Sequence, residues 1–203
     1  DAPPVPNVPV LVLFAVLAVV GELWTIKAPL GDDGVELTFS TAFAFAILMG
    51  FGVFFAVVVS VAASVLADLV SRKPWWKVVF NAALFALVTM ASGVAFTVIA
   101  GKGAVDFDTA FSSGREILAA IVGALTYFGL NSLLLSTAVG LALRTSIWRL
   151  LRQESRYQVI GSIGMFGLAP IALVTAGRSV WLLPILLIPL AVAYQTTVVS
   201  IEK

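Results

Sequence analysis

The chain has 203 residues, of which 61% are apolar and only 11% are charged, and its net charge is +1. Soluble globular domains have about 45–50% apolar and about 25% charged residues, so this composition excludes an ordinary soluble domain, and the charge balance offers no basic surface for nucleic acid. Cysteine and histidine are absent, which excludes disulfides, catalytic thiolates and histidine-dependent metal sites and hydrolases. The sequence predicts an all-α, polytopic integral membrane helical bundle.

Six apolar stretches are each of a length that crosses a bilayer, and they predict about six transmembrane spans in a single domain covering residues 1–203. The proline-rich start, DAPPVPNVP, suits an irregular lead-in to the first span. Residues 200–203 would begin a cytosolic linker helix. The predicted spans lie near residues 8–24, 39–70, 78–100, 117–143, 159–176 and 180–199.

The second stretch is too long for one upright helix. Residues 38–67 carry no charge, and at 1.5 Å per residue they would extend about 45 Å, whereas the hydrocarbon core is about 30 Å thick. Two interpretations remain open: one strongly tilted helix, or a break near Gly50, Phe51 and Gly52, where two glycines flank one residue.

Two cationic loops set the expected topology. Arginines and lysines cluster in SRKPWWK and in RTSIWRLLRQESR, whereas the other connections are acidic or poor in cations. The positive-inside rule places both cationic loops in the cytoplasm. A single crossing by residues 39–70 is the favoured interpretation, and it gives six crossings with both termini cytoplasmic.

Polar residues inside the spans are the candidates for ligand binding. Glu22 lies at the predicted outer end of the first span, where its alternative role is an interfacial anchor. Asn131 lies near the centre of residues 117–143, with Tyr127 one turn before it and Ser136 close by. An amide in hydrocarbon needs a partner, so Asn131 is either a contact in a ligand cavity or a hydrogen bond between helices.

A second polar group is expected at the cytoplasmic face. Asp68 precedes Arg72 by four residues, which is a favourable helical ion pair, and Asn81 follows the cationic loop. Together with Lys73 these residues could form a polar latch. The alternative is an ordinary solvated helix end.

The last apolar segment runs without a helix breaker into LAVAYQTTVVSIEK. Its apolar residues follow the 4-3-4-3 spacing of a coiled-coil seam, which favours a homodimer, although a span that frays into solvent has the same appearance. An uncapped helix that enters the cytoplasm would transmit a signal to an output module. The seam residues are Leu187, Ala191, Tyr194, Val198 and Ile201.

Four segments carry a resemblance: GE-x-W, TFSTAFAFAILMGFG, DLVSRKPWWKVVFNAA, and WLLPILLIPLAVAY leading into TTVVSIEK. In this order they resemble the N-terminal membrane sensor regions, of MASE type, that precede GGDEF, GGDEF–EAL or HD-type cyclic-dinucleotide domains in bacteria. The resemblance implies that Glu22, Ser40, Asp68 and Asn81 are recurrent polar positions, which adds Ser40 to the candidate ligand residues. It also implies the bacterial cytoplasmic (inner) membrane and an output domain beyond these residues.

The expected function is therefore a sensory module that relays a bilayer or extracytoplasmic signal through its last helix to a cytosolic cyclic-di-GMP output domain. Its expected partners are membrane lipids, a small-molecule or lipidic ligand, the output domain and a second copy of the chain. No catalytic constellation, cofactor motif or metal-ligand spacing is present, so the chain is not expected to be an enzyme. The alternative is a small-molecule-binding transporter subunit, similar to the substrate-binding components of vitamin uptake systems.

Overall fold

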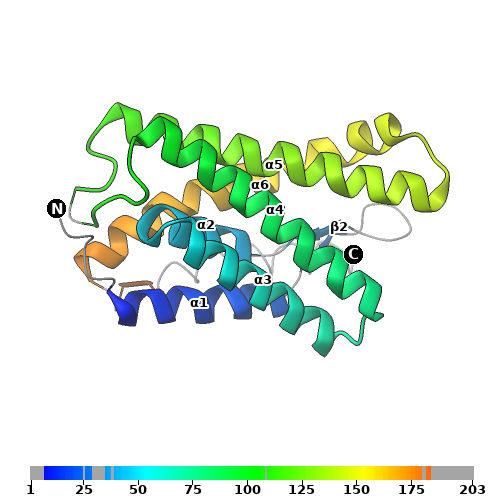
Figure 1. Cartoon of the computed structure of the whole chain (residues 1–203), viewed down its shortest axis with the longest axis horizontal. Helices are drawn as coiled ribbons and strands as arrows, with labels where there is room; N and C mark the ends of the chain where they lie inside the picture. The colour runs from blue at the N-terminus through cyan, green and yellow to red at the C-terminus, as the bar shows by residue number, and fades with distance from the viewer. Residues whose placement is uncertain are drawn as a thin grey trace, which may run out of the picture.

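The computed structural model describes residues 7–24, 26–28, 35–37, 39–107, 109–179 and 182–183. These residues form a helical bundle with one small antiparallel hairpin, β1 (Ile26–Ala28) and β2 (Val35–Leu37), between the first two helices (Figure 1). The fold is therefore helical, as the composition predicts. The helices are α1 (Val8–Leu23), α2 (Ser40–Phe51), α3 (Val53–Val70), α4 (Trp75–Ala100), α5 (Gly114–Leu143) and α6 (Ile147–Arg178).

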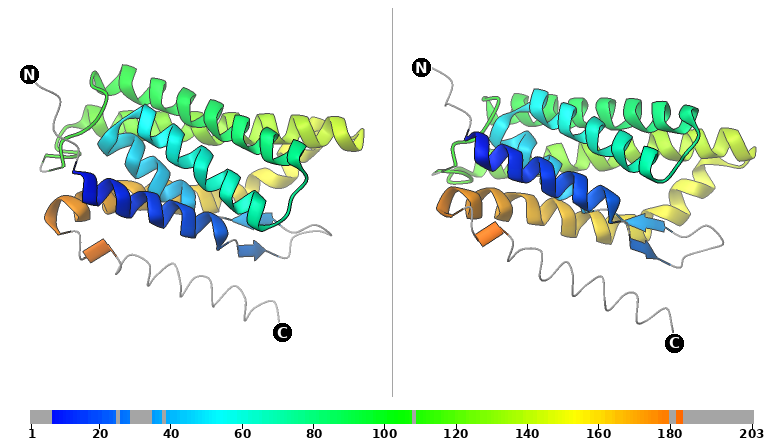
Figure 2. Two further views of the ribbon diagram at one scale, coloured as in Figure 1. Left: turned by 60° about the horizontal axis from the view of Figure 1, so that its bottom comes forward. Right: turned by 90° about the horizontal axis from the view of Figure 1, so that it is seen from below.

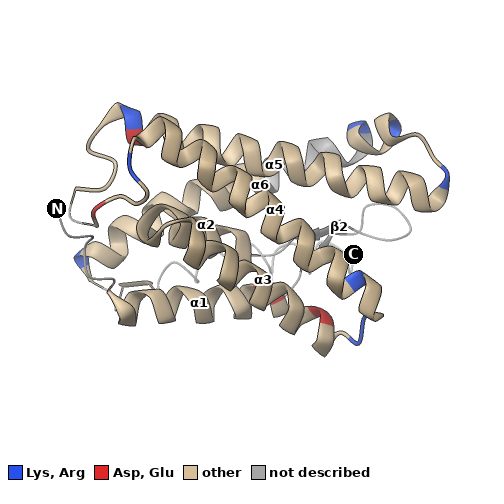
Figure 3. Ribbon diagram, viewed as in Figure 1, with Lys and Arg blue, Asp and Glu red and all other residues tan. Residues whose placement is uncertain are grey.

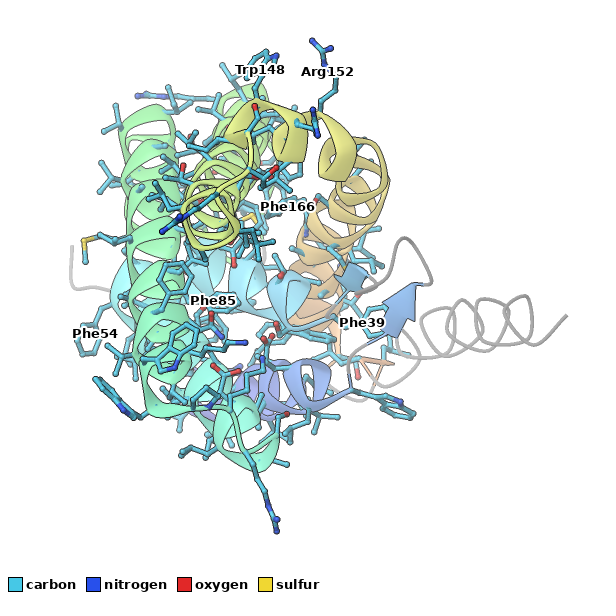
Figure 4. The ribbon with its side chains drawn as sticks, turned by 90° about the vertical axis from the view of Figure 1, so that its right-hand side faces the viewer. Phe39, Phe54, Phe85, Trp148, Arg152 and Phe166 are labelled. Carbon is cyan, nitrogen blue, oxygen red and sulfur yellow. The ribbon has the colours of Figure 1, made fainter. Side chains whose placement is uncertain are left out.

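Three of the helices, α3, α4 and α5, are long and apolar enough to cross a membrane. The apolar helices α1, α2 and residues 162–178 of α6 are shorter. Large apolar side chains cover the outside of the bundle: Phe54 is 73% exposed and points away from it (Figure 4), and Leu125 is 64% exposed. Water would penalise such a surface and hydrocarbon would not, so the helices are those of a membrane protein.

The second apolar stretch is broken at Gly52. This residue has φ 89° and ψ 173°, a conformation that is essentially restricted to glycine, and it separates α2 from α3. The chain reverses there, so that α2 and α3 lie side by side and run in opposite directions (Figures 1 and 2). The break near residues 50–52 is thus present, but the favoured single crossing by residues 39–70 is wrong.

This reversal defines the two ends of the bundle. We call the end formed by the turns 71–74 and 144–146 the cationic end, because the arginines and lysines of both turns lie there (Figure 3). The opposite end, formed by Asn7, Gly52, the connection 101–113 and Ser179, is the loop end (Figure 1). Asn7 and the cationic turns are at opposite ends, whereas a single crossing required them to share one.

Helix α2 forms the centre of the molecule. Every residue from Ala42 to Gly50 is buried, and α2 packs against α1, α3, α4 and α6. Its alanines let these neighbours approach, and its phenylalanines fill the space between them, with Phe43 on Phe14 and Phe45 on Phe166. Apart from Leu182 and Leu183, the predicted last span, residues 180–199, lies outside the described residues.

Candidate functional site

Polar side chains from α1, α2 and α5 come together in the bundle: Ser40 and Tyr127 are buried, and Glu22 and Thr41 are half-buried. The Ser40 hydroxyl donates a hydrogen bond to the Glu22 carboxylate. The Tyr127 hydroxyl shares a hydrogen bond with the Thr41 side chain, and Glu22 is close enough to act on Tyr127 electrostatically. We call these four residues the polar cluster. It unites Glu22, Ser40 and Tyr127, which sequence analysis had selected separately.

A glycine makes the contact between α1 and α2 possible. A Cβ atom added to Gly21 would lie 2.8 Å from the Ser40 backbone nitrogen, which is too close for any other residue. The hairpin β1–β2 returns the chain so that the start of α2 passes over this glycine. Glu22, the next residue, is thereby held against Ser40.

The polar cluster has aromatic walls. The Tyr127 ring meets the Phe166 ring edge-on with centroids 5.5 Å apart, and Phe166 meets Phe45 in the same way at 5.0 Å. The Glu22 carboxylate is half-buried and accepts a hydrogen bond from Ser40, and a carboxylate removed from water is stabilised by such hydrogen bonds or by a counter-charge. Within the described residues, no group of three or more acidic, cysteine or histidine side chains could hold a metal ion.

The structure does not bring Asn131 and Ser136 into the polar cluster. Asn131 lies one turn beyond Tyr127 on α5 and is half-buried, and Ser136 lies about 14 Å beyond Tyr127 along the helix axis. Ser136 is completely buried and has an interaction of its own. Sequence analysis missed Thr41, because nothing in the sequence except its position next to Ser40 indicates a role in binding.

Asp68 and Asn81 form a second polar group at the cationic end. Asn81 Nδ2 donates a 2.7 Å hydrogen bond to Asp68 Oδ2, and Asp68 is only 3% exposed. The cation that pairs with Asp68 is Lys73, at 2.7 Å, and not the predicted Arg72. We call Asp68, Lys73 and Asn81 the latch.

The end of α3 explains this change of partner. The Lys73 N–H bonds to the Asp68 carbonyl and the Arg72 N–H bonds to the Leu69 carbonyl, which is the Schellman arrangement of a helix C-terminus. Arg72 therefore adopts a left-handed conformation, with φ 52°, and is exposed. The same turn folds Lys73 back over the last turn of α3, where it reaches Asp68. The i, i+4 spacing predicts an Asp68–Arg72 pair only if the helix continues to Arg72, and α3 ends before that residue.

Sequence analysis missed a further buried carboxylate, Glu116, at the loop end. It forms a 2.6 Å ion pair with Lys102 and accepts a 2.7 Å hydrogen bond from the Phe111 N–H. Ser113 caps α5 by accepting a hydrogen bond from the Glu116 N–H. The spacing Ser-x-x-Glu of a capping box was the available signal. These contacts fasten the connection 101–113, so Glu116 has a structural role.

An apolar groove lies between α5 and α6, with a volume of about 710 Å³, and it opens to the outside. Ile117, Ile121 and Phe128 line it from α5, and Phe166, Gly167 and Val174 line it from α6. Figure 4 shows Phe166 between these two helices. Phe166 thus separates the groove from Tyr127 of the polar cluster. We call this feature the α5–α6 groove.

No protein-family model matches this chain, and no curated protein is significantly similar to it. Function therefore has to be inferred from the polar cluster, the latch and the arrangement of the helices.

Proposed function

We propose that the chain is a membrane-embedded sensory module, which relays a signal from the bilayer or from outside to a cytosolic cyclic-di-GMP output domain beyond these residues. The observation that carries the proposal is the hydrogen bond of the half-buried Glu22 carboxylate with the buried Ser40 hydroxyl, near the buried Tyr127. An ionisable residue inside a membrane bundle is costly and is therefore a functional candidate by default. The resemblance to MASE-type sensor regions supports the same assignment.

A signal at the polar cluster has a physical route to the rest of the bundle. A proton or a ligand that engages Glu22 competes with its hydrogen bond to Ser40, and hence with the close contact of α1 and α2 at Gly21. At its other end α2 is tightly packed on α6: a Cβ added to Gly50 would lie 2.5 Å from Leu173 Cδ1. Signalling requires that the ligand bind two packings of these helices with different affinity.

The proposed topology follows from the cationic end. The positive-inside rule places it in the cytoplasm, since the turns there and the adjoining helix ends carry Arg72, Lys73, Lys77, Arg144 and Arg149. Asn7 then faces outward. The last span that the sequence predicts, residues 180–199, would then return the chain to the cytoplasm and the output domain. The bacterial inner membrane is the location that the resemblance to MASE-type sensor regions implies.

A reporter fusion tests the proposal. The full chain is joined after Lys203 to a diguanylate cyclase domain and expressed in a bacterial inner membrane, and cyclic di-GMP is measured. Glu22→Gln and Ser40→Ala should each change the output at least about fivefold, because allosteric couplings are typically 1–3 kcal/mol. Asp106→Asn, an exposed carboxylate at the loop end, is the control and should leave it unchanged. Equal output from all variants at equal abundance would refute the sensory role.

A second candidate function is the small-molecule-binding subunit of a transporter. The short, buried α2 and the reversal at Gly52 favour it, since an interrupted central segment is common around substrate sites in transporters. This function predicts a small molecule that stays bound through purification and is visible by native mass spectrometry. It also predicts that the reading frame does not continue from Lys203 into a signalling domain.

A further inference from the structure

We propose that the α5–α6 groove binds one acyl chain of an anionic phospholipid, with the lipid headgroup at Arg178. The groove has a volume of about 710 Å³, within the usual range of ligand sites, and its lining is almost entirely apolar. An empty apolar space of this size does not hold water well, because water there finds few hydrogen-bonding partners. In a bilayer the molecules beside its open side are lipids.

The length of the groove matches one leaflet. Its lining on α6 extends from Ser162 to Thr175, which is about 20 Å at 1.5 Å per residue. Half of the hydrocarbon core is about 15 Å thick. On α5 the lining runs from Ile117 near the loop end to Phe128, so the groove occupies the half of the bundle that contains the loop end.

Arg178 supplies the charge at the loop end of this groove. It follows the lining residue Val174 by four positions on α6, so it continues the same face of the helix by one turn. Two neighbouring cations are already engaged: Lys102 pairs with Glu116 at 2.6 Å, and Arg115 Nε donates to the Ile99 carbonyl at 2.5 Å.

Arg178 itself is exposed, and the structure shows no ion pair between it and another described residue. A guanidinium in this position can bind a phosphate through two parallel hydrogen bonds. The combination of a leaflet-length apolar groove with an available arginine at its end is the recognition chemistry of an anionic phospholipid. A neutral lipid would fill the groove but would not engage Arg178 with a net negative charge.

The proposed lipid would contact Phe166, whose ring packs on Tyr127 and Phe45. The acyl chain is therefore one side chain away from the polar cluster. Binding at the groove does not depend on the sensory role, and it is measured as lipid retention alone. Failure of one proposal is thus distinguishable from failure of the other.

Two glycines of α6 provide a matched steric test. Gly167 lines the groove and Gly164 does not, and an added Cβ would have no neighbour within 4 Å at either position. The full chain in detergent micelles is titrated with phosphatidylglycerol, and bound lipid is counted by native mass spectrometry. Gly167→Leu should lose most of the specifically bound lipid, and Gly164→Leu should retain it. Equal retention by the two variants, or no specific lipid on the wild type, would overturn the proposal.

Two arginines of α6 test the headgroup contact. Phosphatidylglycerol and phosphatidylcholine with identical acyl chains are compared on Arg178→Gln and on Arg149→Gln, which makes the same charge change on an exposed residue at the cationic end. One cation near an anionic headgroup corresponds to about a fivefold preference. Arg178→Gln should abolish that preference, and Arg149→Gln should keep it. If the preference survives in Arg178→Gln or is lost equally in both, the headgroup assignment is wrong.

Discussion

Removing one partner from the latch gives a quantitative test of the structure. Asp68 is almost completely buried, and it accepts a 2.7 Å hydrogen bond from Asn81 Nδ2 and pairs with Lys73 Nζ at 2.7 Å. A hydrogen bond to a charged group contributes about 1.5–3 kcal/mol to stability. Because water does not reach Asp68 freely, the coupling between Asp68 and Asn81 should be about 2 kcal/mol.

The coupling to Lys73 should be smaller. The Lys73 side chain is 36% exposed, so solvent screens its ion pair and about 0.5–1 kcal/mol is expected. Arg72, which sequence spacing had favoured, makes no contact with Asp68 among those that the structure shows, and its coupling should be close to zero. The three pairs therefore give an ordered set of values: Asn81 first, Lys73 second and Arg72 last.

The assay is a set of double-mutant cycles on unfolding by sodium dodecyl sulfate in mixed micelles, followed by tryptophan fluorescence. Each cycle combines Asp68→Ala with Asn81→Ala, Lys73→Met or Arg72→Met, and the interaction energy is the deviation from additivity. An Asp68–Asn81 coupling below about 0.5 kcal/mol, or an Arg72 coupling above that of Lys73, would refute the reasoning.

Two further substitutions test the backbone and the core. Gly52→Ala should destabilise the protein by about 1–3 kcal/mol, because φ 89° and ψ 173° are strained for any other residue. The control in the same unfolding assay is Gly103→Ala, because the space around the Cβ position of Gly103 is open. Thr89→Val should raise stability by about 1 kcal/mol, since the buried Thr89 hydroxyl has no hydrogen-bond partner among the described residues. Thr137→Val, whose hydroxyl already bonds to the Leu133 carbonyl, should give no such gain, and an equal gain would contradict the explanation.

The helices themselves could be predicted because long apolar stretches leave few alternatives. The direction of the chain after Gly52 could not, since it depends on one pair of dihedral angles and on the packing of α2 inside the bundle. The placement of charges did not decide between a single crossing and a reversal. The two cationic loops are separated by α4 and α5 whether residues 39–70 cross once or reverse, so both arrangements satisfy the positive-inside rule.

For the polar residues too, some features could be predicted from the sequence and others depend on the three-dimensional structure. The cost of an ionisable group in a membrane segment selected Glu22, and the spacing to Arg72 selected Asp68, because both signals can be read from residue type and position alone. The identity of the partners depends on geometry across helices. Ser40 reaches Glu22 because Gly21 allows two helices to touch, and Lys73 replaces Arg72 because the chain turns back at the end of α3.

The buried position of α2 also bears on how the protein enters a membrane. Its 12 residues extend about 18 Å, well short of the roughly 30 Å hydrocarbon core, so the insertion machinery has no autonomous span to recognise there. The longer helices α3, α4 and α5 meet that length requirement. Integration of α2 is therefore coupled to assembly: it reaches its final depth only as the neighbouring helices close around it. Biogenesis of this protein should consequently be more sensitive to substitutions that enlarge α2 than to substitutions on the lipid-facing surface.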